Sequence, residues 1–258
     1  MMQDAKDKLI IALDVESAGC ALDLFGVLSE TAGMFKVGSQ LFTAAGPDVV
    51  RQIVSRGGRV FLDLKFHDIP HTVANAAVEA TRLGVSIFSV HAAGGVEMMK
   101  RTVEAVIETA AREGLAKPKV IAVTVLTSLD AQNLPQVGIN AEPARMVTKL
   151  ARLAADCGLD GVVASPHEIG IIRAAVSEAG FLIVTPGIRI ARQQSEDQRR
   201  IMSAAEAVRA GADYVVVGRP VLKAGDPVLA TRQIVAEIAE ALRGPGLLSH
   251  RSAEQNQS

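Results

Sequence analysis

Three ionisable side chains lie at the end of a segment whose other residues are typical of a buried strand. Asp63, Lys65 and Asp68 belong to residues 61–72, which read FLDLKFHDIPHT. An unpaired charge in an apolar interior is very costly, so such groups need partners of opposite charge, and sites of this kind are often functional. An ammonium group preorganised among carboxylates can stabilise negative charge that develops during a reaction. We therefore predict that these charges form the centre of a catalytic site.

The period of a strand decides which of these side chains can meet. Because side chains alternate along a strand, Asp63 and Lys65 are expected on one face and the apolar residues at 62, 64 and 66 on the other. A buried ion pair that only fills space is the structural alternative, although such pairs seldom stabilise a protein relative to apolar packing. Polar groups also lie in or end the other candidate strands: Asp14, Lys36, His91, Thr127 with Ser128, and Gly218 with Arg219. Their number favours a functional site.

Two later loops carry residue types that bind phosphate. Residues 185–189 (TPGIR) and 217–220 (VGRP) each combine a glycine with an arginine after a candidate strand. Glycine allows the backbone to approach a phosphate closely, and arginine supplies planar, permanently charged donors. Solvent-facing arginines beside turn glycines are the alternative for either loop alone. Residues 190–200 form a longer, polar connection, which is either a lid over the site or a solvated loop.

The elements that must position these residues alternate regularly along the chain. Eight short runs rich in β-branched residues are candidate strands: 9–14, 34–37, 59–65, 85–91, 120–126, 161–164, 181–185 and 214–218. Alanine-rich segments with helical periodicity include 73–83, 96–112, 144–157, 167–178, 204–210 and 228–242. Near-continuous apolar strands that alternate with helices indicate a parallel sheet covered on its outside. Eight such units predict one closed (β/α)₈ TIM barrel, with the polar groups gathered at the carboxyl ends of its strands.

A doubly wound open sheet is the competing architecture. The first candidate strand runs from residues 11–14 directly into 15–17 without a Gly-x-Gly-x-x-Gly sequence, so the dinucleotide-binding version loses its main support. We therefore predict a single catalytic domain over residues 1–244. Residues 245–258 lack periodicity and are expected to form a flexible tail.

Composition limits the partners and the location. With 27 basic and 28 acidic side chains the net charge is -1, which gives no electrostatic reason to expect binding to nucleic acid or to an anionic membrane. No apolar run approaches the roughly 18 residues of a membrane-spanning helix. Cys20 and Cys157 lack ligand-like spacing and are expected to be reduced residues packed in helices, as in a cytoplasmic protein. His67, His71 and His91 form no metal-ligand set, so we expect supporting or structural roles for them.

Taken together, the motifs resemble those of the orotidine 5′-phosphate decarboxylase family in its bacterial form. The resemblance extends over essentially the whole chain. It rests on the sequences ALD at 12–14, FKVG at 35–38, D-x-K-x-x-D-I-P-x-T at 63–72, VLTS at 125–128, TPGIR at 185–189, DQRR at 197–200 and VGRP at 217–220. It implies a TIM barrel that converts orotidine 5′-monophosphate into uridine 5′-monophosphate and carbon dioxide, without a metal or other cofactor. This reaction is the last step of pyrimidine nucleotide synthesis.

The resemblance also implies roles for individual residues. Lys65 would donate a proton to C6 of the pyrimidine, and Asp63 would lie beside the carboxylate that leaves. Asp68 and Thr72 would reach into the active site of the second subunit of a homodimer. The remaining residues would hold the substrate: Lys36 and Asp14 near Lys65 and the ribose, Thr127 and Ser128 at the base, and Pro186, Arg189, Gln198, Gly218 and Arg219 around the phosphate.

Two other functions remain open at this point. A magnesium-dependent sugar-phosphate decarboxylase or aldolase of the same barrel superfamily uses a similar Asp-x-Lys-x-x-Asp element to bind the metal. A nucleotide-binding protein without turnover is the non-enzymatic alternative. A pure binding protein has no reason to hold Lys36, Asp63, Lys65 and Asp68 together, which argues for an enzyme.

Overall fold

We describe the fold from a computed structural model of the chain, over residues 2–129, 131–188 and 202–243. The predicted tail at 245–258 and the end of the predicted domain at 244 lie outside these residues. Among the helices described, none is both long and apolar enough to cross a membrane.

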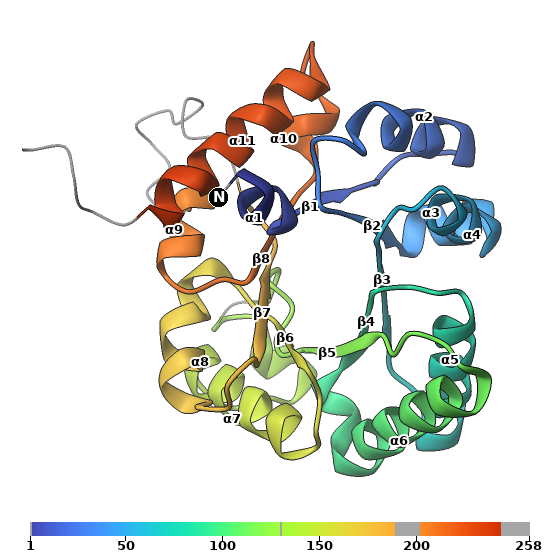
Figure 1. Ribbon diagram of the computed structural model, residues 1–258. Coiled ribbons are helices and arrows are strands. Elements are labelled where there is room, and N and C mark those ends of the chain that lie inside the picture. Colours follow the sequence, from blue (N-terminus) through green and yellow to red (C-terminus); the bar gives the residue numbers. More distant parts are fainter. Residues whose placement is uncertain (1, 130, 189–201, 244–258) are drawn as a thin grey trace, which may run out of the picture.

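Eight parallel strands form a closed barrel in which each strand pairs with the next and β8 pairs with β1. Figure 1 shows the strands at the centre and the helices around them. The strands are β1 Leu9–Ala12, β2 Met34–Gly38, β3 Val60–Phe66, β4 Ile87–His91, β5 Lys119–Val123, β6 Gly161–Val163, β7 Leu182–Thr185 and β8 Tyr214–Val217. The predicted (β/α)₈ barrel is therefore confirmed, and so is each of the eight predicted strands.

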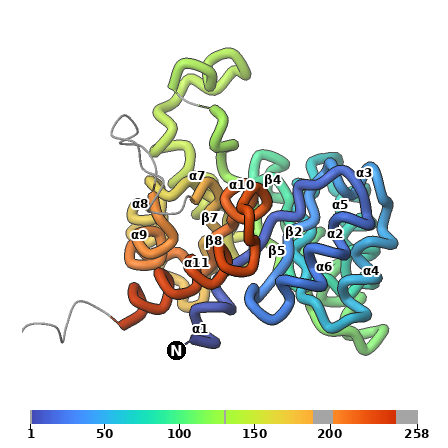
Figure 2. The backbone as a smooth tube through the Cα atoms, turned by 90° about the horizontal axis from the view of Figure 1, so that it is seen from above, coloured from blue at the N-terminus to red at the C-terminus, as the bar shows by residue number. Residues whose placement is uncertain are grey.

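Helices cover the outside of this barrel. They are α1 Met2–Asp7, α2 Ala18–Leu28, α3 Ser39–Ala45, α4 Asp48–Ser55, α5 Pro70–Arg82, α6 Gly95–Glu113, α7 Pro143–Asp156, α8 Ile169–Ala175, α9 Ala204–Arg209, α10 Arg219–Leu222 and α11 Pro227–Leu242. Three short 3₁₀ helices are η1 Ala92–Gly94, η2 Leu134–Val137 and η3 Pro166–Glu168. The connection between β5 and α7, which contains η2, projects away from the body of the barrel (Figure 2).

Several boundaries differ from the sequence prediction. The helix expected at 167–178 is divided into η3 and a shorter α8, and the strand expected at 120–126 ends at Val123. Among helices α1 to α4, only a helical stretch around Cys20 was predicted, without bounds, and it corresponds to α2. Three of them, α1, α3 and α4, have six to eight residues, which is too short for a helical period to stand out.

Two apolar layers hold the barrel together. The inner layer is a small cluster inside the strands, made of Ile10, Ala12, Met34, Phe61, Ile87, Ile121, Val184 and Val216. A larger cluster fills the space between the strands and the helices. Phe61 belongs to the inner cluster and Leu62 to the outer one, while Leu64 and Phe66 pack against the outer one. This alternation confirms the predicted period of β3 and turns Asp63 and Lys65 toward the barrel interior.

The carboxyl-terminal part of β3 departs from regular strand geometry. The pairing of β3 with β4 shifts in register between Leu62 and Phe66. Within this interval Lys65 has φ of 54°, the one positive value among the non-glycine residues that the structure describes. Left-handed backbone is unfavourable for a lysine, and such outliers concentrate at functional sites. The strain marks Lys65 as a residue whose position matters.

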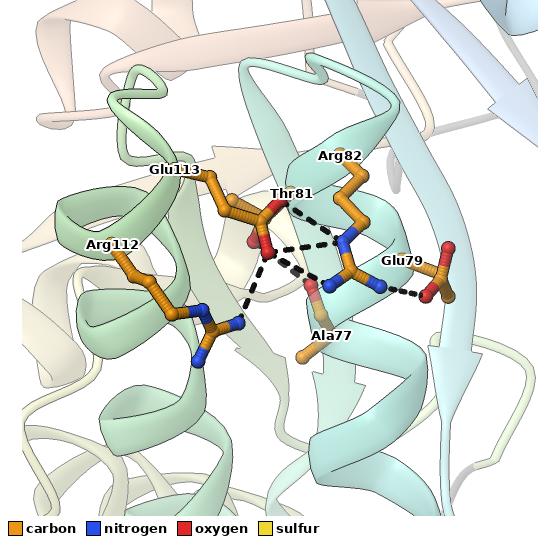
Figure 3. Close-up of polar contacts among 6 residues, drawn as sticks. All are labelled: Ala77, Glu79, Thr81, Arg82, Arg112 and Glu113. Carbon is orange, nitrogen blue, oxygen red and sulfur yellow. Dashed lines mark hydrogen bonds and ion pairs between the residues drawn. The ribbon is translucent and has the colours of Figure 1, made fainter.

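At the opposite end of the barrel, ion pairs join α5 to α6 (Figure 3). The Arg82 guanidinium donates to Glu113 at the end of α6, with a distance of 2.7 Å from Nη2 to Oε1 and 3.0 Å from Nε to Oε2. Arg82 also contacts Glu79, and Arg112 contacts Glu113. Hydrogen bonds from Arg82, and then from Arg112, lower the pKa of Glu113 to about 2. These contacts fix the helix that follows the Asp63–Lys65–Asp68 segment.

The two cysteines differ from each other. Cys157 is buried at the end of α7, where burial raises the pKa of its thiol. Cys20 is exposed on α2, so the expectation that both cysteines pack in the interior is wrong for Cys20. An exposed position on an amphipathic helix has the same sequence context as a half-buried one, and only the docking of α2 decides between them. Both are free thiols.

Candidate active site

Four charged side chains from the ends of β1, β2 and β3 form one connected network. The carboxylate of Asp63 is nearly buried, with the residue 8% exposed, and its Oδ2 accepts a hydrogen bond from Nζ of Lys65 at 2.7 Å. The same oxygen lies 3.8 Å from Nζ of Lys36. Lys36 in turn donates to Oδ1 of Asp14 at 3.0 Å. Carboxylates and ammonium groups therefore alternate in space, so each buried charge has a partner of opposite sign.

The barrel topology brings these residues together although they are distant in sequence. Asp14 follows β1 by two residues, Lys36 lies in β2, and Asp63 and Lys65 lie in β3. Neighbouring parallel strands place their carboxyl ends at the same rim, so inward-facing residues of three adjacent strands must converge there. The predicted convergence of Asp14, Lys36, Asp63 and Lys65 is therefore observed.

Two glycines provide the space that the network needs. A Cβ atom added at Gly38 would lie 2.9 Å from Nζ of Lys36 and 3.5 Å from Oδ1 of Asp14. A Cβ at Gly218 would lie 3.4 Å from Cβ of Ala12 and 3.6 Å from Oδ2 of Asp14. A side chain at Gly38 would therefore press on the Lys36–Asp14 ion pair, whereas a Cβ at Gly218 would only touch it at van der Waals distance. Gly38 is thus part of the site, although only its presence in the FKVG motif pointed to it.

Ser89, in β4, is a second residue that sequence reasoning missed. It is fully buried, and its hydroxyl contacts both Asp63 and the backbone of Lys65. A polar residue between the apolar Phe88 and Val90 in a predicted strand was the available signal. It could have been found by extending the inward-facing alternation from His91 to Ser89.

A cavity of about 1050 Å³ opens beside this network. Six residues predicted from the sequence line it, namely Asp14, Lys36, Thr127, Pro186, Gly218 and Arg219. They follow or lie in β1, β2, β5, β7 and β8, so the cavity occupies the carboxyl-terminal rim. Its volume is sufficient for a nucleotide-sized ligand. Lys36 lines the cavity and also contacts Asp63, and so connects the ligand space to the buried charges.

The cavity wall also contains residues that were not predicted. They are Ser165, Pro166, His167, Met202, Val216, Lys223 and Ala224; the remaining lining residues, Ala12, Gly187, Ile188 and Pro220, belong to motifs that the sequence analysis named. Ser165 and Pro166 come directly after β6 and could have been found from the rule that the βα loops form the site. In the loop after β6, the Glu168 carboxylate accepts a hydrogen bond from the Ser165 amide at 2.8 Å. Burial raises the pKa of Glu168, and that hydrogen bond opposes the rise.

Some of the predicted site residues lie away from this cavity. Asp68 and Thr72 are exposed at the start of α5, and Asp68 forms no ion pair with Lys36 or Lys65 in the part of the chain described. The Asp68 carboxylate instead accepts a hydrogen bond from the Ile69 amide at 2.6 Å. Ser128 is exposed and does not line the cavity. The structure of one chain thus leaves these three residues outside the charged network.

Two residues predicted to bind phosphate fall outside the described residues. They are Arg189 and Gln198. The glycine that precedes Arg189, Gly187, lines the cavity with φ of 82°, a conformation that favours glycine. Of the predicted phosphate loops, the structure therefore places 186–188 and 218–220 at the cavity.

Two histidines stack beside the lysine. The rings of His67 and His91 have centroids 5.2 Å apart. Burial lowers the pKa of His91, and the nearby His67 and Lys65 lower it further. A neutral His91 adds no positive charge to the site at neutral pH. His71 instead pairs with Asn75 on the exposed side of α5.

A closed parallel barrel with paired lysines and carboxylates at the carboxyl-terminal rim, beside glycine- and arginine-containing loops, defines a TIM-barrel enzyme that acts on a phosphorylated ligand. Comparison with known proteins makes this class specific. The model of the family described as "Orotidine 5'-phosphate decarboxylase / HUMPS family" matches residues 7–234. The chain belongs to this family.

Individual relatives agree with the family assignment. Orotidine 5'-phosphate decarboxylase of Syntrophotalea carbinolica is 52% identical over 242 residues, which cover 94% of this chain and 99% of the relative. The protein of the same name from Moorella thermoacetica is 55% identical over 235 residues, 91% of this chain and 93% of the relative. Among solved structures, orotidine 5'-phosphate decarboxylase from Lactobacillus acidophilus matches with a TM-score of 0.76 and 36% identity. That match covers 89% of this chain and 98% of the other.

Proposed function

We propose that this chain is a carboxy-lyase that converts orotidine 5′-monophosphate into uridine 5′-monophosphate and carbon dioxide. The relatives described above are named for this activity, and this chain is similar to them over nearly their whole length. The observation that carries the proposal is the buried Asp63 carboxylate in contact with Lys65 and close to Lys36 at the cavity. The same relatives give no support to the magnesium-dependent alternative.

Lys65 is the proton donor in this proposal. When the bond between C6 and the carboxylate breaks, its electron pair stays on C6 and the carboxylate departs as carbon dioxide. No adjacent carbonyl delocalises the resulting carbanion, so the protein must supply much of its stabilisation. The ammonium of Lys65, held 2.7 Å from Asp63, stabilises the negative charge and then transfers a proton to C6.

Asp63 raises the free energy of the bound substrate, in addition to positioning Lys65. Its carboxylate faces the substrate carboxylate, and their repulsion is relieved when carbon dioxide leaves. Because the Asp63 side chain is only 11% exposed, water screens this repulsion weakly.

The rest of the cavity binds the parts of the nucleotide that do not react. Asp14 and Lys36 hold the ribose hydroxyls. Thr127 and Ser128 address the base, and Pro186, Arg189, Gln198, Gly218 and Arg219 surround the phosphate. Arg219 and Gly218 line the cavity at the end of β8, which supports this assignment. Energy from binding the remote phosphate then contributes to catalysis at C6.

The active enzyme is a homodimer that shares its active sites. Asp68 and Thr72 are exposed, and Ile69 between them is 66% exposed, as expected for a segment that a second subunit covers. Mixing Lys65→Ala and Asp68→Asn subunits tests this arrangement. Each variant alone should be nearly inactive, whereas mixed dimers regain activity because one of their two sites is intact. If mixing restores no activity although dimers exchange, Asp68 is not shared.

One assay tests the reaction itself. Loss of orotidine 5′-monophosphate absorbance is followed with the purified protein, with and without a metal chelator. Turnover that persists in chelator supports a metal-free decarboxylase, and a strict magnesium requirement supports the sugar-phosphate alternative. Tight binding of uridine 5′-monophosphate without carbon dioxide release would identify a binding protein instead. A cytoplasmic location belongs to the same proposal and is supported by the two free cysteines.

A further inference from the structure

Ser89 occupies a position that links the reacting residues through β4. Its side chain faces the barrel interior, since Ile87, two residues earlier on the same strand, belongs to the inner apolar cluster. The residue is completely buried. A hydroxyl in such a place must have partners for both its hydrogen and its lone pairs.

Both partners of this hydroxyl belong to the catalytic segment of β3. Oγ of Ser89 donates to Oδ1 of Asp63 at 2.9 Å and accepts from the backbone N–H of Lys65 at 3.0 Å. The first bond orients the carboxylate so that its other oxygen, Oδ2, faces Lys65 and Lys36. The second bond falls where the pairing of β3 with β4 shifts and where Lys65 has φ of 54°.

These contacts give the hydroxyl a function that packing alone would not. In a regular ladder the amide of Lys65 would bond to a backbone carbonyl of the next strand, but the register shift interrupts that ladder. Ser89 supplies the acceptor in place of the backbone and so holds the left-handed turn at Lys65. The same oxygen therefore sets the backbone of the proton donor and the orientation of its carboxylate partner.

We propose that Ser89 is a positioning residue that fixes Asp63 and Lys65 relative to each other for decarboxylation, an inference that rests on the proposed function. Removing the hydroxyl leaves Oδ1 of Asp63 and the backbone N–H of Lys65 without their hydrogen bonds to Ser89. The loops at Gly218 and Pro186 should stay unchanged. The reacting groups lose their alignment, and the nucleotide still binds. The expected signature is a lower kcat with little change in KM.

The test compares three substitutions at this position. Ser89→Ala is expected to lower kcat roughly 10- to 100-fold, the range in which misplacement of reacting groups by about an ångström falls. KM and the Kd for uridine 5′-monophosphate should change less than about threefold, because the lost interaction serves the transition state. Ser89→Thr keeps the hydroxyl and should recover most of the rate. Ser89→Cys leaves no cavity but offers only a weak donor and a weak acceptor, so it should also be slow, and it provides the test if the alanine variant folds poorly.

A matched control separates alignment from loss of a buried hydroxyl in general. Thr81→Val removes a fully buried hydroxyl that donates to the Ala77 carbonyl on α5, at 2.8 Å (Figure 3). This variant should keep the wild-type kcat. The inference is overturned if a folded Ser89→Ala or Ser89→Cys protein turns over within about twofold of wild type, or if Ser89→Thr is as slow as Ser89→Ala. Absence of activity in the wild-type protein would instead refute the proposed function.

Discussion

Replacing Lys65 with alanine is the most direct perturbation of the proposed chemistry. Lysine and alanine both carry a Cβ, so the strained backbone at this position, with φ of 54°, stays equally strained. What disappears is the ammonium that lies 2.7 Å from Oδ2 of Asp63. The substitution therefore removes the proposed proton donor without relaxing the bulge that carries it.

The expected loss follows from the two functions that Lys65 combines. General acid catalysis contributes roughly 10²- to 10⁴-fold, and a preorganised electrostatic donor roughly 10²- to 10³-fold. Together they predict that kcat falls by about 10⁴- to 10⁷-fold, or about 5–10 kcal/mol in activation free energy. Lys36 lies farther from Asp63, at 3.8 Å, and already pairs with Asp14, so it cannot replace the missing group.

The fold and the nucleotide site should survive this change. Asp63 keeps the hydrogen bond from Ser89 at 2.9 Å and the nearby charge of Lys36. The loss in unfolding free energy should therefore stay below the roughly 3–5 kcal/mol expected when a buried charge loses its partner entirely. Calorimetric titration with uridine 5′-monophosphate and thermal unfolding measure these two properties independently of turnover.

Single-turnover measurement of absorbance loss provides the decisive assay. Lys100→Ala, which removes an exposed lysine from α6, is the matched control and should turn over like the wild type. Activity of Lys65→Ala within tenfold of wild type, in a protein that binds uridine 5′-monophosphate normally, would refute the assignment of Lys65 as proton donor.

Two further perturbations probe the space around the site and the stability of the barrel. Gly38→Ala should lower kcat/KM by about tenfold, because its Cβ would lie 2.9 Å from Nζ of Lys36 and displace that ammonium. Gly26→Ala, at a position with nothing within 4 Å, is the control, and equal activity of the two variants would contradict the steric argument. Glu113→Gln should reduce the free energy of unfolding in urea more at pH 7 than at pH 3. The Arg82 contact lowers the pKa of Glu113 to about 2, so the stabilisation exists above the ordinary value of 4.5 and is lost as pH falls toward 2. If Glu113→Gln lowered the free energy of unfolding by the same amount at pH 7 and at pH 3, the ion pairs in Figure 3 would contribute no charge-dependent stability.

The barrel could be predicted because its signals are local. Each strand is a short apolar run with polar residues near its carboxyl end, and the helices after β3 carry a readable period. Helices α3 and α4 stayed hidden because seven or eight residues contain barely two turns. The exposure of Cys20 could not be predicted either, since it depends on how α2 docks.

The sequence by itself determined the order of the elements, the closed barrel and the identity of the charged residues at its rim. These properties follow from strand period and from residue types, and both can be read within one short segment of the sequence. Only the tertiary structure decided that Ser89, 26 residues from Asp63, supplies the hydrogen bond to its carboxylate. It also decided that Lys65 adopts left-handed backbone and that Gly38 leaves space for Lys36. Such facts depend on the register between neighbouring strands, because a contact across strands exists only once both are placed.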